Sequence, residues 1–309
     1  MDTKFDDEVT LYYQPIVKST NGDLLAFEAL LRPCDGAADE TFAQRKSSEY
    51  AAGNLLNDLD RWVIHRALDD GSVLREHGID APIHVNVALA DLDRGGTEQF
   101  TSWIDDLGDQ GGRAVVEILE NTPASDAENL RSVIDVCHHT GIRVAFDDFG
   151  TGYASLLALQ QLQPDIVKID KKFVRDLLRD KKTRAIVHML IDLAHKLGIS
   201  VVAEGVEGTA QWEWLRLAGC DEIQGFVVAK ALRAPDEIIS WNVDWTYRMQ
   251  DARRRGLPPT QAAETALSVS PAGRQEKIRL LSAAMLQYAR EHAEKCRHFP
   301  AQRNCVARR

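Results

Sequence analysis

The stretch that decides the fold is Arg143-Val144-Ala145-Phe146-Asp147-Asp148-Phe149-Gly150-Thr151-Gly152-Tyr153. A short run of β-branched and aromatic residues ends in two adjacent aspartates and a glycine-containing turn, which is the pattern of a buried strand. Parallel α/β sheets and barrels place their chemistry at the C-terminal ends of strands, where these aspartates fall. Adjacent side chains on a strand point to opposite faces, so Asp147 and Asp148 converge only if the strand bends there. The alternative interpretation is a solvated turn or a helix N-cap.

The same pattern of a strand followed by polar residues recurs along the chain. We expect further strands at residues 11–17, 24–31, 83–88, 113–120, 165–170, 199–204 and 222–228. Apolar residues at helical spacing predict helices at residues 55–77, 97–107, 124–139, 154–162, 172–197 and 209–218. Asn21-Gly22 predicts a hairpin, so the first two strands pair antiparallel. The fold class is therefore α/β, a (β/α)8 TIM-like barrel with an antiparallel first strand.

Polar side chains gather at or near one end of these strands, whereas a merely solvated surface would scatter them over both ends. They are Glu28, Asn86, Glu117, Asp147, Asp148, Lys168, Glu204 and Gln224. Glu28 is the most informative, because a carboxylate inside an apolar strand is costly unless it is paired or binds a cation. The sequence thus predicts a site at one rim of the barrel.

The residue types at this rim indicate a particular chemistry. Converging carboxylates repel one another, and divalent cations relieve that repulsion. Ligands that are all oxygen suit Mg²⁺, Mn²⁺ or Ca²⁺ rather than Zn²⁺. Two such ions about 3.5–4 Å apart form a clamp for in-line attack on a phosphodiester. Asp147 could bridge the ions, Glu204 could act as a base near the attacking water, and Lys168 could orient that water or hold a phosphate oxygen.

Composition and charge exclude several classes of protein. The chain has 309 residues with 44% hydrophobic and 27% charged content, which is typical of a globular protein, and no apolar run long enough for a membrane span. The net charge is −10, but residues 246–309 carry 13 Lys/Arg against 5 Asp/Glu. Residues 1–245 are acidic overall, and binding to a nucleic-acid polymer needs a basic surface, so we do not expect such binding. The five cysteines lack metal-site spacing and are interpreted as reduced thiols. The N-terminal residues are acidic and polar, unlike a signal peptide. Together these features predict a cytoplasmic location.

The charge asymmetry suggests two parts. Residues 1–245 are predicted to form the barrel, and residues 246–309 a basic C-terminal extension, with a linker at 253–259 and a helix over 276–298. Three roles are open for the extension: packing on the outside of the barrel, contributing to a dimer, or binding a protein partner. The histidines, His84 among them, show no clustered spacing and are interpreted as surface or core residues rather than ligands. Trp212 and Trp214 are interpreted as packing residues.

Several motifs occur together in an order that resembles the EAL-type cyclic-di-GMP phosphodiesterases over roughly residues 8–243. They are Tyr13-Gln14-Pro15-Ile16-Val17, Glu28-Ala29-Leu30-Leu31-Arg32, Val85-Asn86-Val87, Glu117-Ile118-Leu119-Glu120, Asp147 to Tyr153, Lys168-Ile169-Asp170, Glu204-Gly205-Val206-Glu207 and Gln224-Gly225-Phe226. The resemblance implies hydrolysis of one phosphodiester of cyclic-di-GMP to give linear pGpG, with a two-metal site holding Mg²⁺ or Mn²⁺. It also implies a homodimer.

The resemblance assigns roles to individual positions. The implied metal ligands are Glu28, Asn86, Glu117, Asp147 and Asp148. The implied catalytic residues are Glu204 as base and Lys168 for water handling, with Asp148 and Glu28 taking part through the metal. The implied substrate-binding residues are Gln14, Arg32 and Gln224, and the implied loop-anchoring residues are Glu120, Glu207 and Asp170.

The chain also departs from the family pattern. Pro33 stands where the family usually has Trp, Ala88 replaces a frequent Ser, Phe226 stands for Tyr, and Ala231 for a common Pro. Residues 34–54, beside the expected substrate entrance, retain little beyond Thr41-Phe42. These departures concern substrate affinity more than metal binding. They leave two alternatives open: a cyclic-di-GMP receptor with weak or no catalysis, and a protein-interaction module.

Overall fold

The computed structural model describes residues 5–34, 42, 46, 56–87, 100, 101, 104, 113–119, 127–150 and 156–264. The strands are β1 (Val9–Lys18), β2 (Leu24–Pro33), β3 (Ile83–Asn86), β4 (Ala114–Leu119), β5 (Arg143–Phe149), β6 (Ile166–Ile169), β7 (Ser200–Ala203), β8 (Glu222–Gln224) and β9 (Leu232–Arg233). The described helices are α2 (Leu56–Glu76), α4 (Ala127–His139), α5 (Leu156–Leu162), α6 (Lys171–Asp176), α7 (Lys181–Lys196), α8 (Thr209–Leu217), α9 (Asp236–Arg254) and α10 (Pro259–Glu264).

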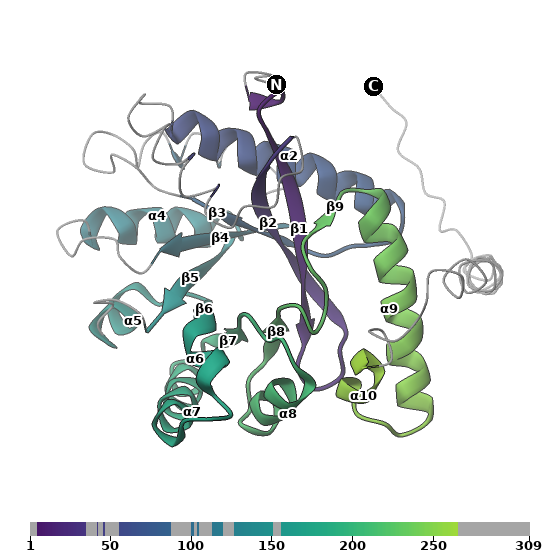
Figure 1. Cartoon of the computed structure of the whole chain (residues 1–309). Coiled ribbons are helices and arrows are strands. Elements are labelled where there is room, and N and C mark those ends of the chain that lie inside the picture. The colour runs from purple at the N-terminus through teal and green to yellow at the C-terminus, as the bar shows by residue number, and fades with distance from the viewer. Residues whose placement is uncertain are drawn as a thin grey trace, which may run out of the picture.

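The sheet closes into a barrel. Neighbouring strands follow the order β2-β3-β4-β5-β6-β7-β8-β1, and β1 also pairs with β2, so the eight strands form a ring to which β9 adds a short pair. Strand β1 runs antiparallel to both β2 and β8, whereas β2 to β8 are parallel to one another. Figure 1 shows the strands at the centre and the helices around them. The predicted barrel with an antiparallel first strand is confirmed.

The β1–β2 hairpin forms where the sequence predicts it. Gly22 adopts φ +73°, in the left-handed region that favours glycine, and the Asn21 side chain accepts a hydrogen bond from the Asp23 N–H at 3.0 Å. Lys18 N–H donates to the Asp23 carbonyl at 2.8 Å and closes the turn. Strand β2 is therefore placed directly beside β1, and this contact brings Gln14 opposite Glu28.

Two predicted elements are wrong in their extent. The single helix expected over 172–197 is two helices, because Asp180 caps α7 by accepting hydrogen bonds from the Lys182 and Thr183 N–H groups. The last strand, expected over 222–228, ends at Gln224. Gly225 has φ +149°, and a Cβ there would meet the backbone of Val206, so the chain turns away at this point.

The barrel interior is divided into layers. Side chains on one face of a strand alternate with those on the other, so every second residue points inward. A cluster of buried apolar side chains separates the two mouths of the barrel: Ile16, Ala26, Val115, Ala145, Ile166 and Val202. A second, larger core lies between the strands and the helices. The inward residues that follow this cluster along the parallel strands form the rim where the site is predicted.

Helix α9 packs on the barrel beyond the predicted boundary at residue 245. The Trp245 ring stacks on Trp212 of α8 with centroids 6.3 Å apart, and its Nε1–H donates to the Gly22 carbonyl at 2.7 Å. The 245/246 boundary therefore lies inside a helix, and residues 253–259, expected as a linker, contain the end of α9. The helix predicted over 276–298 lies outside the described residues.

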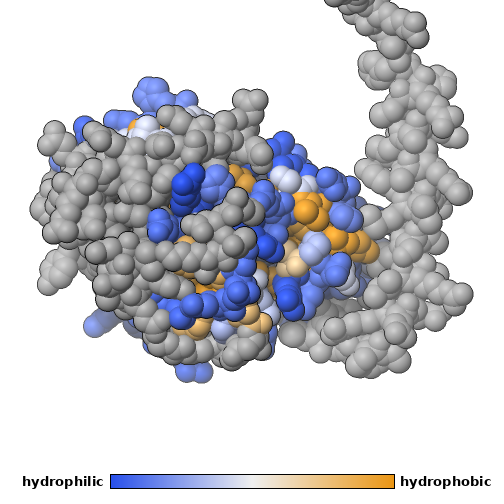
Figure 2. Space-filling model, turned by 90° about the horizontal axis from the view of Figure 1, so that it is seen from above, coloured by the Kyte–Doolittle hydropathy of each residue, from blue (hydrophilic) through white to orange (hydrophobic). Residues whose placement is uncertain are grey.

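The surface shows a mixture of side chains. Figure 2 shows one face on which hydrophilic side chains predominate among the coloured residues, with hydrophobic ones gathered in a few places. Within the described residues, no helix is both long enough and apolar enough to cross a membrane.

Candidate active site

Lys168 lies at the centre of the predicted rim. It is on β6, and its side chain is 1% exposed. Its Nζ lies 2.6 Å from Glu204 Oε1, 2.8 Å from Glu117 Oε2, 3.2 Å from Asp147 Oδ1 and 3.3 Å from Glu28 Oε2. These carboxylates come from four different strands or strand ends. Strand register therefore brings together residues that are far apart in sequence.

The carboxylates lie at different depths. The Glu117 side chain is 0% exposed and Glu28 is 8% exposed, whereas Asp147 is 13% and Glu204 is 17% exposed. Glu117 is thus the floor of the cluster. Glu204 is the member most accessible to water, which suits a group that exchanges a proton with it.

Two amide side chains donate hydrogen bonds to Glu28, and a third is linked to it through Gln224. Asn86 Nδ2 donates to Glu28 Oε1 at 3.2 Å, and Gln224 Nε2 donates to Glu28 Oε2 at 2.5 Å. Gln224 Nε2 also donates to Gln14 Oε1 at 3.2 Å, and Gln14 donates to the Ala229 carbonyl at 2.9 Å. The predicted residues Asn86, Gln224 and Gln14 therefore belong to one network with Glu28.

A bulge in β5 brings the two aspartates together. The pairing of β5 with β6 shifts register between Phe146 and Phe149, and Asp148 adopts φ +54°, which an L-residue rarely adopts. The bend required by the sequence is therefore present, although β5 continues to Phe149 instead of ending at the aspartates. Asp147, Asp148 and Glu204 each offer an oxygen within 4.8 Å of the others.

Burial and mutual repulsion shape the titration of the cluster. Burial alone would lower the pKa of Lys168, but the carboxylates around it raise that pKa well above its usual value. Burial raises the pKa of Glu117 and of Glu204 well above the usual value for a glutamate. Burial, together with a hydrogen bond to Asp170, raises the pKa of Asp148 to about 7. One ammonium group thus faces more negative charge than it can neutralise.

This arrangement fits divalent cations with oxygen ligands. Asp147 Oδ1 is buried, and although it lies near Lys168 it has no hydrogen-bond partner among the described residues. Gln224 Oε1 is likewise buried without a partner in the described part of the chain. Mg²⁺ and Mn²⁺ prefer oxygen ligands of this kind. The two unpartnered oxygens and the uncompensated carboxylates could therefore serve as metal ligands.

The remaining predicted residues lie outside this cluster. The guanidinium of Arg32, at the end of β2, donates to the Leu31 carbonyl at 2.8 Å. Asp170 caps α6 by accepting from the Lys172 N–H at 2.8 Å and contacts Asp148, while Glu207 is exposed and its N–H donates to Gln211. Glu120 lies outside the described residues. The assigned roles of these residues stay predictions.

Sequence reasoning missed the contribution of His84. This residue is 0% exposed, and its Nδ1 lies 2.7 Å from Glu117 Oε1. Burial, with the charge of Lys168 nearby, lowers the pKa of His84 well below its usual value. The strand period would have found it, because His84 lies two residues before Asn86 and therefore on the same face of β3.

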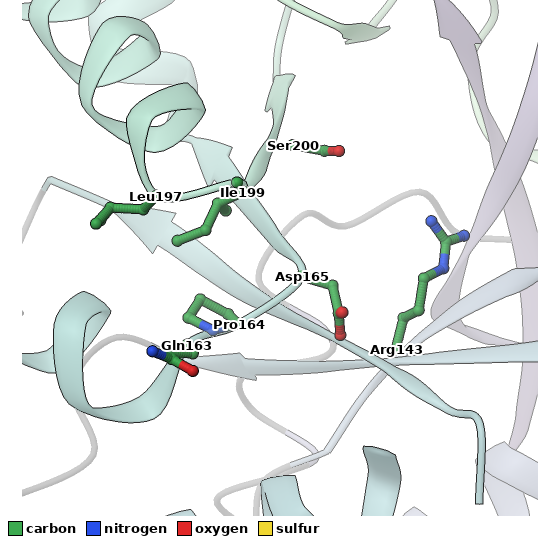
Figure 3. A pocket seen from close by; sticks show the side chains of 8 residues that line it. Arg143, Gln163, Pro164, Asp165, Leu197, Ile199 and Ser200 are labelled. Atoms are coloured by element: carbon green, nitrogen blue, oxygen red, sulfur yellow. The ribbon is translucent and has the colours of Figure 1, made fainter. Parts of the chain in front are cut away.

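A separate cavity of about 410 Å³ lies at the opposite ends of the strands (Figure 3). Gln163, Pro164 and Asp165 line it from the segment before β6, and Leu197, Ile199 and Ser200 line it from the segment that leads into β7. Asp165 Oδ2 is already held by the Val144 N–H at 2.8 Å. The cavity contains none of the predicted site residues.

Fold and site together define a class of protein: an eight-stranded α/β barrel with an antiparallel first strand and an acidic cluster at one rim. Comparison with known families matches the EAL domain to residues 3–231. The chain belongs to the EAL domain family, in which cyclic-di-GMP phosphodiesterases are found.

Individual relatives are similar over the same region. An uncharacterised protein of Mycobacterium tuberculosis is 35% identical over 273 residues, which cover 85% of this chain and 41% of the relative. The bifunctional diguanylate cyclase/cyclic di-GMP phosphodiesterase MucR of Pseudomonas aeruginosa is 31% identical over 238 residues, which cover 75% of this chain and 34% of MucR. The chain thus spans less than half the length of these relatives.

Solved structures of relatives contain nucleotide and metal. The MucR phosphodiesterase in complex with c-di-GMP superposes with a TM-score of 0.66 at 29% identity, covering 75% of this chain and 95% of that chain. A manganese/cyclic-di-GMP complex of Klebsiella pneumoniae BlrP1 has a TM-score of 0.62 at 26% identity, covering 73% of this chain and 56% of that chain.

Proposed function

We propose that the protein hydrolyses cyclic-di-GMP to linear pGpG and depends on Mg²⁺ or Mn²⁺. The observation that carries this proposal is the convergence of Glu28, Glu117, Asp147 and Glu204 within 3.3 Å of one ammonium nitrogen. A structural ion pair needs one carboxylate for one lysine. The excess of buried negative charge is instead suited to cations that would neutralise a phosphodiester.

Glu28, Asn86, Glu117, Asp147 and Asp148 are the proposed metal ligands. Their donor atoms are oxygens, and three of the carboxylates surround Lys168 at the floor and wall of the site. Divalent cations held there would activate a water and neutralise charge on the phosphoryl oxygens. Asp148, in its strained backbone position, would be held in place by Asp170.

The chain's own groups supply the proton chemistry. Glu204 is the proposed general base, because it is the most exposed of the four carboxylates around Lys168, and because burial raises its pKa above the usual value for a glutamate. Lys168 holds the Glu204 carboxylate at 2.6 Å and would orient the attacking water. Gln14, Gln224 and Arg32 are proposed to contact the substrate, with Asp170, Glu207 and Glu120 supporting the loop after β5.

The experiment is an assay for product. Purified protein is incubated with cyclic-di-GMP and Mg²⁺ or Mn²⁺, beside the Glu28→Ala variant, and pGpG is followed by chromatography. We expect pGpG from the parent and none from the variant. No pGpG from metal-saturated parent would contradict the proposal, and a binding measurement would then distinguish a cyclic-di-GMP receptor from a protein-interaction module.

The other assignments stay predictions. The family resemblance motivates a homodimer, which the molar mass from light scattering would test. A protein partner for the C-terminal extension, and a cytoplasmic location inferred from the cysteines, are expectations from sequence.

A further inference from the structure

His84 lies directly behind the acidic cluster. Strand register pairs it with Glu28 of β2 on one side and with Val115 of β4 on the other, and Asn86 of the same strand pairs with Glu117. Its ring is fully buried, next to the apolar layer to which Val115 belongs. The histidine therefore joins the apolar interior of the barrel to the carboxylates above it.

The hydrogen bond to Glu117 defines the state of the ring. As a metal ligand Glu117 is an ionised carboxylate, which only accepts hydrogen bonds, so in that form of the site the 2.7 Å contact is donated by a proton on His84 Nδ1. Nε2 is buried and has no partner among the described residues. A proton on Nε2 would be a buried donor without an acceptor, so the contacts favour the neutral Nδ1–H tautomer.

This hydrogen bond gives the two carboxylate oxygens of Glu117 different partners. Oε1 accepts from His84, while Oε2 faces Lys168 at 2.8 Å. The carboxylate cannot rotate about its last bond without breaking the contact to His84. Oε1 is thus held by His84 on the interior side, and Oε2 points to the centre of the site.

We propose that His84 is a positioning residue: it holds Glu117 Oε1 so that Oε2 is presented to a divalent cation, and it contacts neither the cation nor the substrate. This inference rests on the proposed function, in which Glu117 is a metal ligand. Groups that orient ligands from behind typically change metal affinity by about 10–100-fold when they are removed.

The test compares His84→Leu with His84→Asn. Leucine fills a similar volume without a donor, whereas the asparagine amide can place an N–H near the position of Nδ1. Mn²⁺ binding is measured by the electron paramagnetic resonance signal of free Mn²⁺, without substrate, and thermal unfolding reports on folding. We expect His84→Leu to bind Mn²⁺ about 10–100-fold more weakly, with His84→Asn closer to the parent.

Equal Mn²⁺ affinity of His84→Leu and the parent would overturn the proposal. Should the leucine variant fail to fold, ¹⁵N NMR of the parent decides: the account requires a neutral Nδ1–H ring whose signals shift on addition of Mg²⁺, and an Nε2–H tautomer would contradict it. Mn²⁺ binding by a parent that forms no pGpG would refute the phosphodiesterase but not the role of His84. No Mn²⁺ binding by the parent would refute both.

Discussion

Replacing Lys168 by methionine removes the positive charge on which the carboxylates of the site converge. Methionine has a similar length, so most of the packing is retained while Glu28, Glu117, Asp147 and Glu204 lose their counter-charge. Leaving a buried ion pair with one partner typically costs about 3–5 kcal/mol. Burial already raises the pKa of Glu117 and of Glu204, so proton uptake by these groups offsets part of the cost.

We therefore take the lower value of about 3 kcal/mol. For a domain of this size each kcal/mol shifts the Tm by about 2–4 °C, so we expect the variant to melt roughly 6–12 °C lower at pH 7 in the presence of EDTA. The difference shrinks toward pH 5, because protonation relieves the repulsion in the variant. Mn²⁺ supplies the missing charge and raises the Tm of the variant more than that of the parent.

Thermal unfolding of parent and variant, with EDTA and with Mn²⁺, measures these shifts. Lys196→Met is the matched control, because Lys196 is 70% exposed and contacts Asp192 on the same helix surface. We expect little change for this control. An unchanged Tm for Lys168→Met in EDTA, or a smaller response to Mn²⁺ than in the parent, would refute the reasoning.

Other substitutions test separate parts of the account. Glu204→Gln should lower kcat by about 10²–10⁴ while cyclic-di-GMP binding persists, and loss of binding instead would argue against a base. Burial raises the pKa of Glu222 to about 7, so its folded state retains a proton that the unfolded chain loses; stability therefore falls as pH rises from about 4.5 through 7. Glu222→Gln should be stabilising by up to about 3 kcal/mol at pH 8 and near neutral at pH 4, whereas equal effects in urea unfolding at both values would contradict this. Trp245→Ala should cost about 3–5 kcal/mol, and a loss below 1 kcal/mol would mean that α9 is not part of the barrel's core.

The strand period explains why the rim could be predicted from sequence. Glu28, Glu117 and Lys168 each interrupt an apolar strand, and such an interruption has few explanations other than a site. Parallel strands then bring their C-terminal ends to one rim, so the cluster follows from topology without further information. The hairpin could be predicted for a different reason, because Asn21-Gly22 specifies a turn locally.

What could not be read depends on contacts between distant parts of the chain. The bulge at Asp148 is visible only once β5 is paired with β6. The end of β8 depends on the close approach of Gly225 to Val206. The break before α7 is the exception, because the Asp180 cap is a local contact to Lys182 and Thr183 that the helical spacing of apolar residues does not reveal. The strand period places His84 on the same face of β3 as Asn86, but its role was not readable, because that role arises from a hydrogen bond to Glu117 on the next strand.

The central claim is tested most directly by the metal dependence of product formation. Metal-stripped parent protein is titrated with Mn²⁺ at a fixed concentration of cyclic-di-GMP, and the initial rate of pGpG formation is followed by chromatography. The account predicts no product before Mn²⁺ is added, a rate that rises to saturation, and its abolition by EDTA. Absence of pGpG at every Mn²⁺ concentration, or a rate indifferent to EDTA, would contradict it.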